Sequence, residues 1–171
     1  MKKRMYTFLA AVLFASLFLV SCTEKTGTKT QDENIRTIEA VLQNSLNGPS
    51  DELNRMLEGE GFGDLIKYEE DLYKDYFANE ASYLEFVNNY ASTLMIEPRR
   101  NDYKLKVKNI EYEKTESKEI IYNFSVVLQY KKEGSEKSQV EIVTGQANLN
   151  EEHKIEDMLI RINDFLGSLD N

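Results

Sequence analysis

The hydrophobic period of the chain changes near Tyr103, and this change limits the folds that it can adopt. From about Asp32 to Pro98, apolar side chains recur at the three- and four-residue spacing of amphipathic helices. From Tyr103 onward they alternate with polar side chains, as in half-buried strands. Helices followed by strands predict an α+β domain rather than an alternating α/β one. We therefore expect one domain over 32–171, with N-terminal helices packed on a curved antiparallel sheet of about four strands.

The helical half contains several start and stop signals. A capping box at 30–33 is expected to open the first helix, and Asn47-Gly48-Pro49 to end it. Asn79 is expected to cap the last of these helices, and Pro98 to end it. The glycine cluster at 59–63 reads GEGFG, which matches no phosphate-binding fingerprint, so we expect a plain loop there. The expected helices cover about 32–46, 50–57, 64–78 and 79–97.

The strand half alternates with a period of two. A bulge near Lys108-Asn109 would keep the first strand in phase, Gly134 marks a hairpin turn, and Gly145 suggests a bulge or bend. Residues 154–162 fit either a strand or a helix by spacing alone. The tight turn expected at 150–153 favours a strand, followed by a short helical tail. The expected strands cover about 103–112, 122–130, 138–149 and 154–162.

The first residues read as an export signal. Lys2, Lys3 and Arg4 precede an uncharged stretch over 5–23, which includes the almost continuous apolar run 8–20. A positive start followed by an apolar segment of this size is typical of a secretory signal peptide. An uncleaved transmembrane anchor is the alternative, since the run approaches the ~20 residues that span a bilayer.

The end of the apolar run, Leu19-Val20-Ser21-Cys22, resembles the lipobox of bacterial lipoproteins. This resemblance implies a diacylglyceryl group on the Cys22 thiol and cleavage between Ser21 and Cys22. Residues 1–21 are then a signal peptide, and 22–31 are the lipidated cysteine and a polar tether with a reach of roughly 17 Å. The alternative is an incidental cysteine beside an ordinary cleavage site. Since the chain has one cysteine, an intramolecular disulfide is excluded.

The net charge of the chain limits the classes of partner that it can bind. The full sequence carries a formal net charge of −9, and loss of residues 1–21 would leave 18 basic and 30 acidic side chains, a net charge of −12. This balance argues against non-specific nucleic-acid binding, which needs a surplus of Lys and Arg. Anionic lipid head groups would repel the domain, so membrane attachment is expected to come from the lipid on Cys22.

The stretch from Tyr68 to Ile162 resembles a group of small lipoproteins of low-GC Gram-positive bacteria. The likeness is carried by Tyr76-Phe77, by 87–90 and by four segments of the strand half, 103–110, 122–126, 145–149 and 154–155. It implies a cystatin-like or nuclear transport factor 2-like fold, in which a curved sheet wraps around helices and forms a cone that can hold a pocket. The group lends no catalytic motif, so no site residue is transferred from it.

Candidate chemistry is sparse in this sequence. The third predicted helix carries a run of carboxylates, expected to form a solvated polar face with an ion pair between Glu70 and Lys74. His153, the single histidine, is expected to be solvated in a turn. Most of the ten tyrosines fall at core spacing, with a pocket or partner surface as the alternative. We assign no catalytic, cofactor-binding or metal-binding residue. The carboxylates in question are Glu69, Glu70, Asp71 and Asp75.

Two functions fit these observations. The first is a non-enzymatic interaction or accessory domain, lipid-anchored on the outer face of the cytoplasmic membrane, with a protein partner at the cell envelope. The alternative is a small-molecule binding protein that uses the cone of the fold as its pocket. The inner face of the sheet discriminates between them, because Phe124, Val126 and Leu128 would either fill the cone or line a cavity.

The lipobox prediction can be tested by itself. A Cys22→Ala variant is expected to accumulate as an unprocessed precursor without fatty acid, because the thiol that accepts the lipid is gone. Metabolic labelling with a fatty acid, followed by electrophoresis of the membrane fraction, measures both effects. If the variant still incorporates the label, the assignment of Cys22 is wrong.

Overall fold

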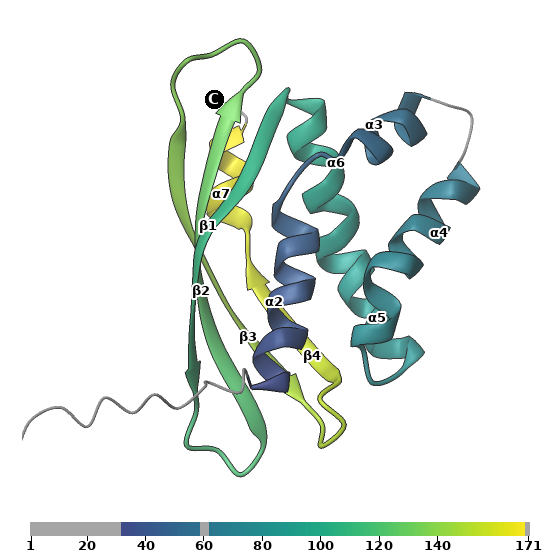
Figure 1. Ribbon diagram of the computed structural model, residues 1–171, viewed down its shortest axis with the longest axis vertical. Helices are drawn as coiled ribbons and strands as arrows, with labels where there is room; N and C mark the ends of the chain where they lie inside the picture. The colour runs from purple at the N-terminus through teal and green to yellow at the C-terminus, as the bar shows by residue number, and fades with distance from the viewer. Residues whose placement is uncertain (1–31, 59–61, 170–171) are drawn as a thin grey trace, which may run out of the picture. The chain divides into compact units, whose positions relative to one another are not determined.

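A computed structural model describes residues 32–58 and 62–169, and it confirms the α+β architecture (Figure 1). Short helices occupy the first half of the domain and a four-stranded sheet the second. The helical elements before the sheet are α2 (Glu33–Leu46), α3 (Asp51–Glu58), α4 (Phe62–Tyr73), a 3₁₀ turn (Lys74–Tyr76), α5 (Glu80–Phe86), a π-helical turn (Val87–Ala91) and α6 (Ser92–Arg100). The remaining elements are β1 (Tyr103–Lys114), β2 (Ile120–Lys132), β3 (Gln139–Leu149), β4 (Ile155–Arg161) and α7 (Asn163–Leu169).

The sheet is a meander in which each strand pairs antiparallel with the next, in the order β1-β2-β3-β4. Its first hairpin contains the predicted bulge, since the register of β1 against β2 shifts between Val107 and Asn109. The second hairpin turns through Gly134 at φ +76°, as the sequence predicts. The strand interpretation of 154–162 is confirmed, and α7 is the short helical tail.

Helices α2 to α6 lie on one side of the sheet (Figure 1), and the inward side chains of the strands join them in one apolar core. On β2 every second residue is buried, and the three central ones, Phe124, Val126 and Leu128, are at most 3% exposed. From α2, Ile38, Val41 and Leu42 are fully buried in the same core. Burial of such side chains stabilises the fold by about 1.5–3 kcal/mol each.

Both ends of α2 are fixed to the sheet. At its start, Oδ1 of Asp32 accepts a hydrogen bond from the Asn34 amide at 3.0 Å, and Oδ2 accepts one from the Tyr122 hydroxyl. The N-cap is therefore Asp32, not the first residue of the predicted capping box, and residues 30 and 31 lie outside the described chain. At its other end, Gly48 exchanges two backbone hydrogen bonds with Leu105 of β1.

The third predicted helix ends earlier than expected. Its α-helical part stops at Tyr73, and Phe77 is extended rather than helical. The reason lies in the sheet, because Phe77 forms a parallel bridge with Ile155 and the Ala78 amide donates to the Ile155 carbonyl at 2.9 Å. This contact covers the outer edge of β4 at its start.

The fourth predicted helix is continuous in sequence but irregular in form. Asn79 caps it as predicted, with Oδ1 accepting from the Ser82 amide at 3.0 Å. A π-helical turn then interrupts it at Val87–Ala91, and the prediction that Pro98 ends it is wrong, because α6 runs on to Arg100. Pro98 lies in the last turn, where its missing N–H removes one hydrogen bond, and its ring is buried.

Gly145 does not form the expected bulge. It keeps regular register with Phe124 on β2 and with Ile160 on β4, and the irregularity of β3 falls between Asn148 and Leu149 instead. A Cβ at position 145 would lie 2.6 Å from Cε2 of Phe124, and closer still to Cζ of that ring and to the Leu159 carbonyl oxygen. The glycine is therefore required so that the Phe124 ring can lie across the strand.

This contact predicts a clear difference between two glycine substitutions. Gly145→Ala is expected to destabilise the domain by about 1–3 kcal/mol, because the backbone carbonyl of Leu159 and the buried ring must both shift. The matched control is Gly167→Ala in α7, where an added Cβ meets nothing within 4 Å, and where alanine is expected to stabilise the helix by up to about 1 kcal/mol. Urea unfolding of both variants measures the difference, and equal midpoints would contradict this account of Gly145.

Candidate functional site

The lipidation site predicted at Cys22 and the cleavage site after Ser21 lie outside the described residues, as do residues 59–61 of the glycine cluster. They therefore remain predictions from the sequence. Across residues 32–58 and 62–169, the structure has no helix that is long and apolar enough to cross a membrane. The described domain therefore offers its surface, its core and its small cavities as possible functional sites.

The inner face of the sheet is filled in the described domain. Phe124 is 3% exposed, Val126 and Leu128 are fully buried, and all three belong to the core shared with the helices. Aromatic rings close the space between α4 and α5, since the centroids of Tyr73 and Phe86 lie 5.3 Å apart. The side chains that would line a cone-shaped pocket thus form the core instead.

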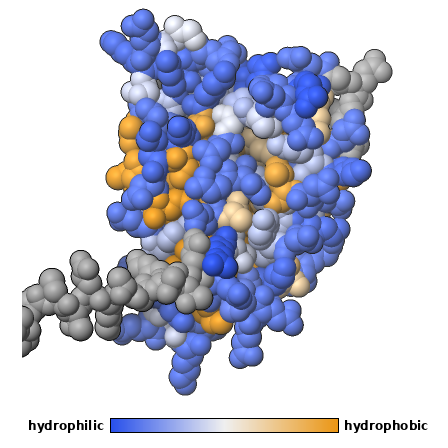
Figure 2. Space-filling view, in the orientation of Figure 1, coloured by the Kyte–Doolittle hydropathy of each residue, from blue (hydrophilic) through white to orange (hydrophobic). Residues whose placement is uncertain are grey.

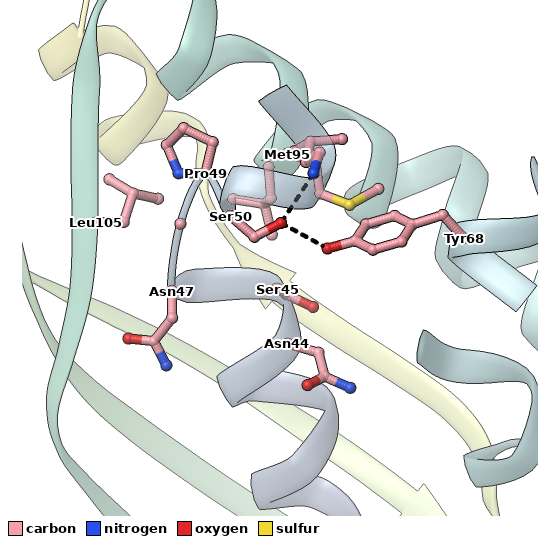
Figure 3. Close-up of a pocket in the computed structure, with 11 residues that line it drawn as sticks. Asn44, Ser45, Asn47, Pro49, Ser50, Tyr68, Met95 and Leu105 are labelled. Carbon is pink, nitrogen blue, oxygen red and sulfur yellow. Dashed lines mark hydrogen bonds between the residues drawn. The ribbon is translucent and has the colours of Figure 1, made fainter. Parts of the chain in front are cut away.

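A small cavity lies where the C-terminal end of α2 faces α3, α4 and α6 (Figure 3). Ser50 and Tyr68 face each other in it, with their hydroxyl oxygens 2.9 Å apart, and the Leu53 amide donates to Ser50 Oγ at 3.0 Å. Its volume of about 20 Å³ suffices for about one water molecule. Ligand sites usually measure about 300–1,000 Å³, so this cavity is too small for a substrate.

The sequence predicts that the carboxylates of α4 share one solvated face, and this prediction is wrong for Glu69. Glu69 is 6% exposed and accepts a hydrogen bond at 2.7 Å from the Ser92 hydroxyl of α6. Burial raises the pKa of its carboxyl, and the hydrogen bond from Ser92 opposes that rise. Its spacing already placed it inward, because Glu69 lies four residues before the fully buried Tyr73 on the same face of the helix.

The pair of Glu69 and Ser92 is a carboxylate beside a hydroxyl, which in an open site could serve as base and nucleophile. Here the carboxylate is buried, and neither residue lines the cavity beside Tyr68. The nearby Tyr73 is fully buried, and this burial raises the pKa of its hydroxyl. The Ser45 hydroxyl oxygen lies 3.4 Å from that of Tyr73, and this contact opposes the rise. We interpret these groups as polar contacts that join α2, α4 and α6.

Of the other acidic side chains of this region, Glu70 and Glu80 pair with one lysine. Lys74 bridges the two, with its Nζ 3.1 Å from Glu70 and 3.1 Å from Glu80, so the predicted pair of Glu70 and Lys74 is confirmed. Within the described residues, no group of three His, Cys, Asp or Glu side chains is arranged to hold a metal ion.

The sequence predicts a solvated His153, but in the structure its side chain has two partners. Its Nδ1 lies 2.9 Å from Oδ1 of Asn34 and its Nε2 lies 3.0 Å from Oε2 of Glu33, and its backbone adopts φ +62°. A protonated imidazole would donate to both oxygens. The side chain therefore joins the β3–β4 turn to the start of α2, a contact between residues that are distant in sequence.

The outer face of the sheet carries a surface that sequence reasoning missed. Val140 and Ile142 of β3 are 59% and 63% exposed, and Ile142 lies opposite Val127 of β2. Figure 2 shows apolar side chains gathered on the flank of the molecule, over the sheet. The signal was present in the sequence, because β3 has apolar residues at 140, 142 and 143, on both of its faces.

Basic side chains surround this apolar group. Lys106 lies opposite Gln129, Lys104 lies opposite Lys131, and Arg161 lies opposite Thr144, all at outward positions of the strands. Among these residues, Lys104 pairs with Glu133 of the hairpin at 3.0 Å. We call the whole set the outer patch: Val127, Val140 and Ile142 with Lys104, Lys106, Lys131 and Arg161. In a chain with a net charge of −9, it is a local region of opposite sign.

Comparison with known proteins supports the fold and nothing more specific. No family model matches the sequence, and no curated protein matches it. Among solved structures, the domain is similar to the solution structure of TraH, a candidate transfer protein of the Gram-positive conjugative plasmid pIP501. The TM-score is 0.51 at 14% sequence identity, and the match covers 77% of this chain and 93% of TraH. A likeness at this identity shows a shared fold.

The buried carboxyl of Glu69 predicts a pH-dependent stability. Because its pKa is raised in the folded state, the stability that its neutral form provides is present at acid pH and is lost as pH rises through that pKa. Glu69→Gln keeps an acceptor for Ser92 without the charge. The variant is expected to be more stable than the wild type at neutral pH, with a difference that shrinks as the pH falls.

Urea unfolding across the acid range measures this difference. Asp71→Asn, a change at an exposed carboxylate of the same helix, is the matched control. A difference for Glu69→Gln that does not change with pH would contradict a buried, pKa-shifted carboxyl.

Proposed function

We propose that this protein is a lipoprotein anchored through Cys22 on the outer face of the cytoplasmic membrane, where its domain binds a protein partner without catalysing a reaction. The anchor is inferred from the resemblance of residues 19–22 to a lipobox. The binding role is inferred from the domain itself. No enzymatic step enters the proposal, because the carboxylate of the Glu69–Ser92 pair is buried.

The observation that carries the binding role is the contrast between the two faces of the sheet. The inner face is filled by core side chains, whereas the outer face presents exposed apolar side chains at Val140 and Ile142. Apolar side chains with a polar or charged rim are typical of protein interaction surfaces. A small-molecule binding protein that uses the cone of this fold would need a pocket there, and in the described domain core side chains fill that space.

The outer patch is compatible with an anchored domain. Asp32, where the predicted tether enters, binds Tyr122 near one end of β2. Lys131 lies nine residues further along that strand, roughly 30 Å away. The tether has a reach of roughly 17 Å, so a partner could bind the outer patch while the lipid remains in the bilayer. The likeness to TraH concerns the fold, and plasmid transfer does not enter the proposal.

Capture from cross-linked native membranes tests this function. The lipidated wild type is expected to recover the same partner in repeated experiments, and Ile142→Lys is expected to reduce that recovery about tenfold, a change of about 1.4 kcal/mol. Ile66→Lys is the matched control, because Ile66 is an isoleucine of nearly equal exposure, 61% against 63%, on α4.

The comparison of these two variants decides the outcome. Recovery that falls for Ile142→Lys and not for Ile66→Lys supports the proposal. Recovery of no partner by the wild type, or equal recovery by both variants, would contradict it.

A further inference from the structure

The second strand-pairing edge of β3 is open along part of its length. β4 pairs with β3 only from Thr144 onward, because β4 ends at Arg161 and the chain then enters α7. Helix α7 contacts the core, with the Phe165 ring 5.6 Å from that of Tyr130, an inward residue of β2. Residues 139–143 therefore pair with β2 on one side, and in the described chain no strand pairs with them on the other.

The outer edges of β1 and β4, in contrast, are partly covered by hydrogen bonds from the helical half of the domain. Leu105 of β1 exchanges two backbone hydrogen bonds with Gly48, and Oδ1 of Asn47 accepts from the Val107 amide at 2.8 Å. The far edge of β4 is bonded at Ile155 by the amide of Ala78. These contacts cover the starts of β1 and β4, whereas residues 139–143 of β3 have no comparable cover among the described residues.

The sequence of this open segment also lacks most of the usual protection of an edge. Natural edge strands carry lysine, proline or a bulge, which prevent another strand from pairing with them. Residues 139–143 read QVEIV, with no lysine or proline, and they keep regular register with β2. Their one charged side chain, Glu141, lies opposite Leu128 at an inward position, where a charge gives partial protection. Val140 and Ile142 project from this segment into the outer patch. The edge and the apolar side chains thus belong to one continuous surface.

We propose that β3 binds an extended, acidic segment of a partner protein as an added strand, in the position that β4 would occupy if it continued past Arg161. Its backbone would pair with the free N–H and C=O groups that alternate along residues 139–143. On its outer side, apolar side chains would contact Ile142 and Val140, and carboxylates would lie beside Arg161 at the end of β4, with Lys131 one strand further away on β2. This inference rests on the proposed binding function and names the surface and the chemistry of the partner.

The observations favour a strand over two other occupants. A lipid bilayer offers no row of donors and acceptors at strand spacing, so it would leave the backbone of residues 139–143 unpaired. A second copy of this chain would present its own cationic rim to the same rim, and like charges repel. An acidic strand satisfies both the open backbone and the basic side chains.

Peptide binding to the lipidated full chain, purified in detergent, tests this proposal. The probe is a blocked peptide in which valine and glutamate alternate along one face, with threonine at every position between them. The first control has the same sequence with every second amide methylated, which removes donors along one edge of the peptide. The second control replaces glutamate with lysine. Amide chemical shifts and hydrogen exchange of an isotope-labelled chain locate the binding.

The acidic peptide is expected to shift the amides of residues 139–143 and to slow exchange at alternate positions among them. Methylation and the exchange of glutamate for lysine are each expected to weaken binding about tenfold or more, a change of about 1.4 kcal/mol. Ile142→Lys is expected to weaken it to a similar extent, and Ile66→Lys to leave it unchanged.

Three results would overturn strand addition. Equal binding of the methylated peptide would mean that the outer patch acts without backbone pairing, and the proposed function would survive. Perturbation of these amides by phosphatidylglycerol vesicles, and not by the acidic peptide, would identify a membrane surface. Dimerisation through residues 139–143, or the absence of any acidic-peptide effect there, would also exclude the proposal.

Discussion

The core between the sheet and the helices governs the rest of the structure, and it depends on the close approach of Phe124 to the backbone at Gly145. The ring of Phe124 lies where a Cβ of residue 145 would be, so β2 and β3 can bring it inward without a break in their register. From this contact the inner face continues through Val126 and Leu128 to the buried side of α2. Because this face is filled, the free surfaces of the sheet are its outer face and its edges.

The edges of the sheet show how the helices and strands are joined. The chain leaves α2 at Gly48, which bonds β1, and it leaves the α4 segment at Phe77 and Ala78, which bond β4. Each of these connections uses an extended residue after a helix to pair with a strand that comes much later in sequence. Residues 139–143 receive no such connection within the described chain. The difference follows from the length of β4, which ends before the hairpin end of β3.

Much of this architecture could be predicted from the sequence. The change of period near Tyr103, the bulge after Val107, the turn at Gly134 and the cap at Asn79 each follow from local physical rules, and the structure confirms them. Local rules were enough because each concerns residues a few positions apart. They also favoured the strand at 154–162, where the preceding turn resolved an ambiguous pattern.

Apart from the local errors at Pro98 and at the N-cap of α2, the errors involve contacts between distant segments. Phe77 leaves the helix because it pairs with β4, Glu69 turns inward to meet Ser92, and His153 binds the start of α2. The bulge expected at Gly145 is wrong because the ring that this glycine accommodates comes from another strand. Periodicity describes which face of an element is apolar, but it does not say which elements meet there.

The candidate surface escaped prediction for a related reason. Val140 and Ile142 were counted as ordinary members of an alternating strand, while Val143 occupies the inward position. Only the extent of β4 shows that the edge of β3 beside these residues is open. The lipidation site at Cys22 is the converse case, because its four-residue pattern is local and lies outside the described structure.

The central claim is that the hairpin end of β3 is an open edge of a filled sheet. Amide hydrogen exchange in the free full chain tests it most directly, since it reports backbone pairing residue by residue. The account predicts slow exchange throughout residues 144–149, which pair on both sides, and alternating fast and slow exchange along residues 139–143. Uniformly slow exchange along residues 139–143 would contradict it, because it would mean that this edge is already paired.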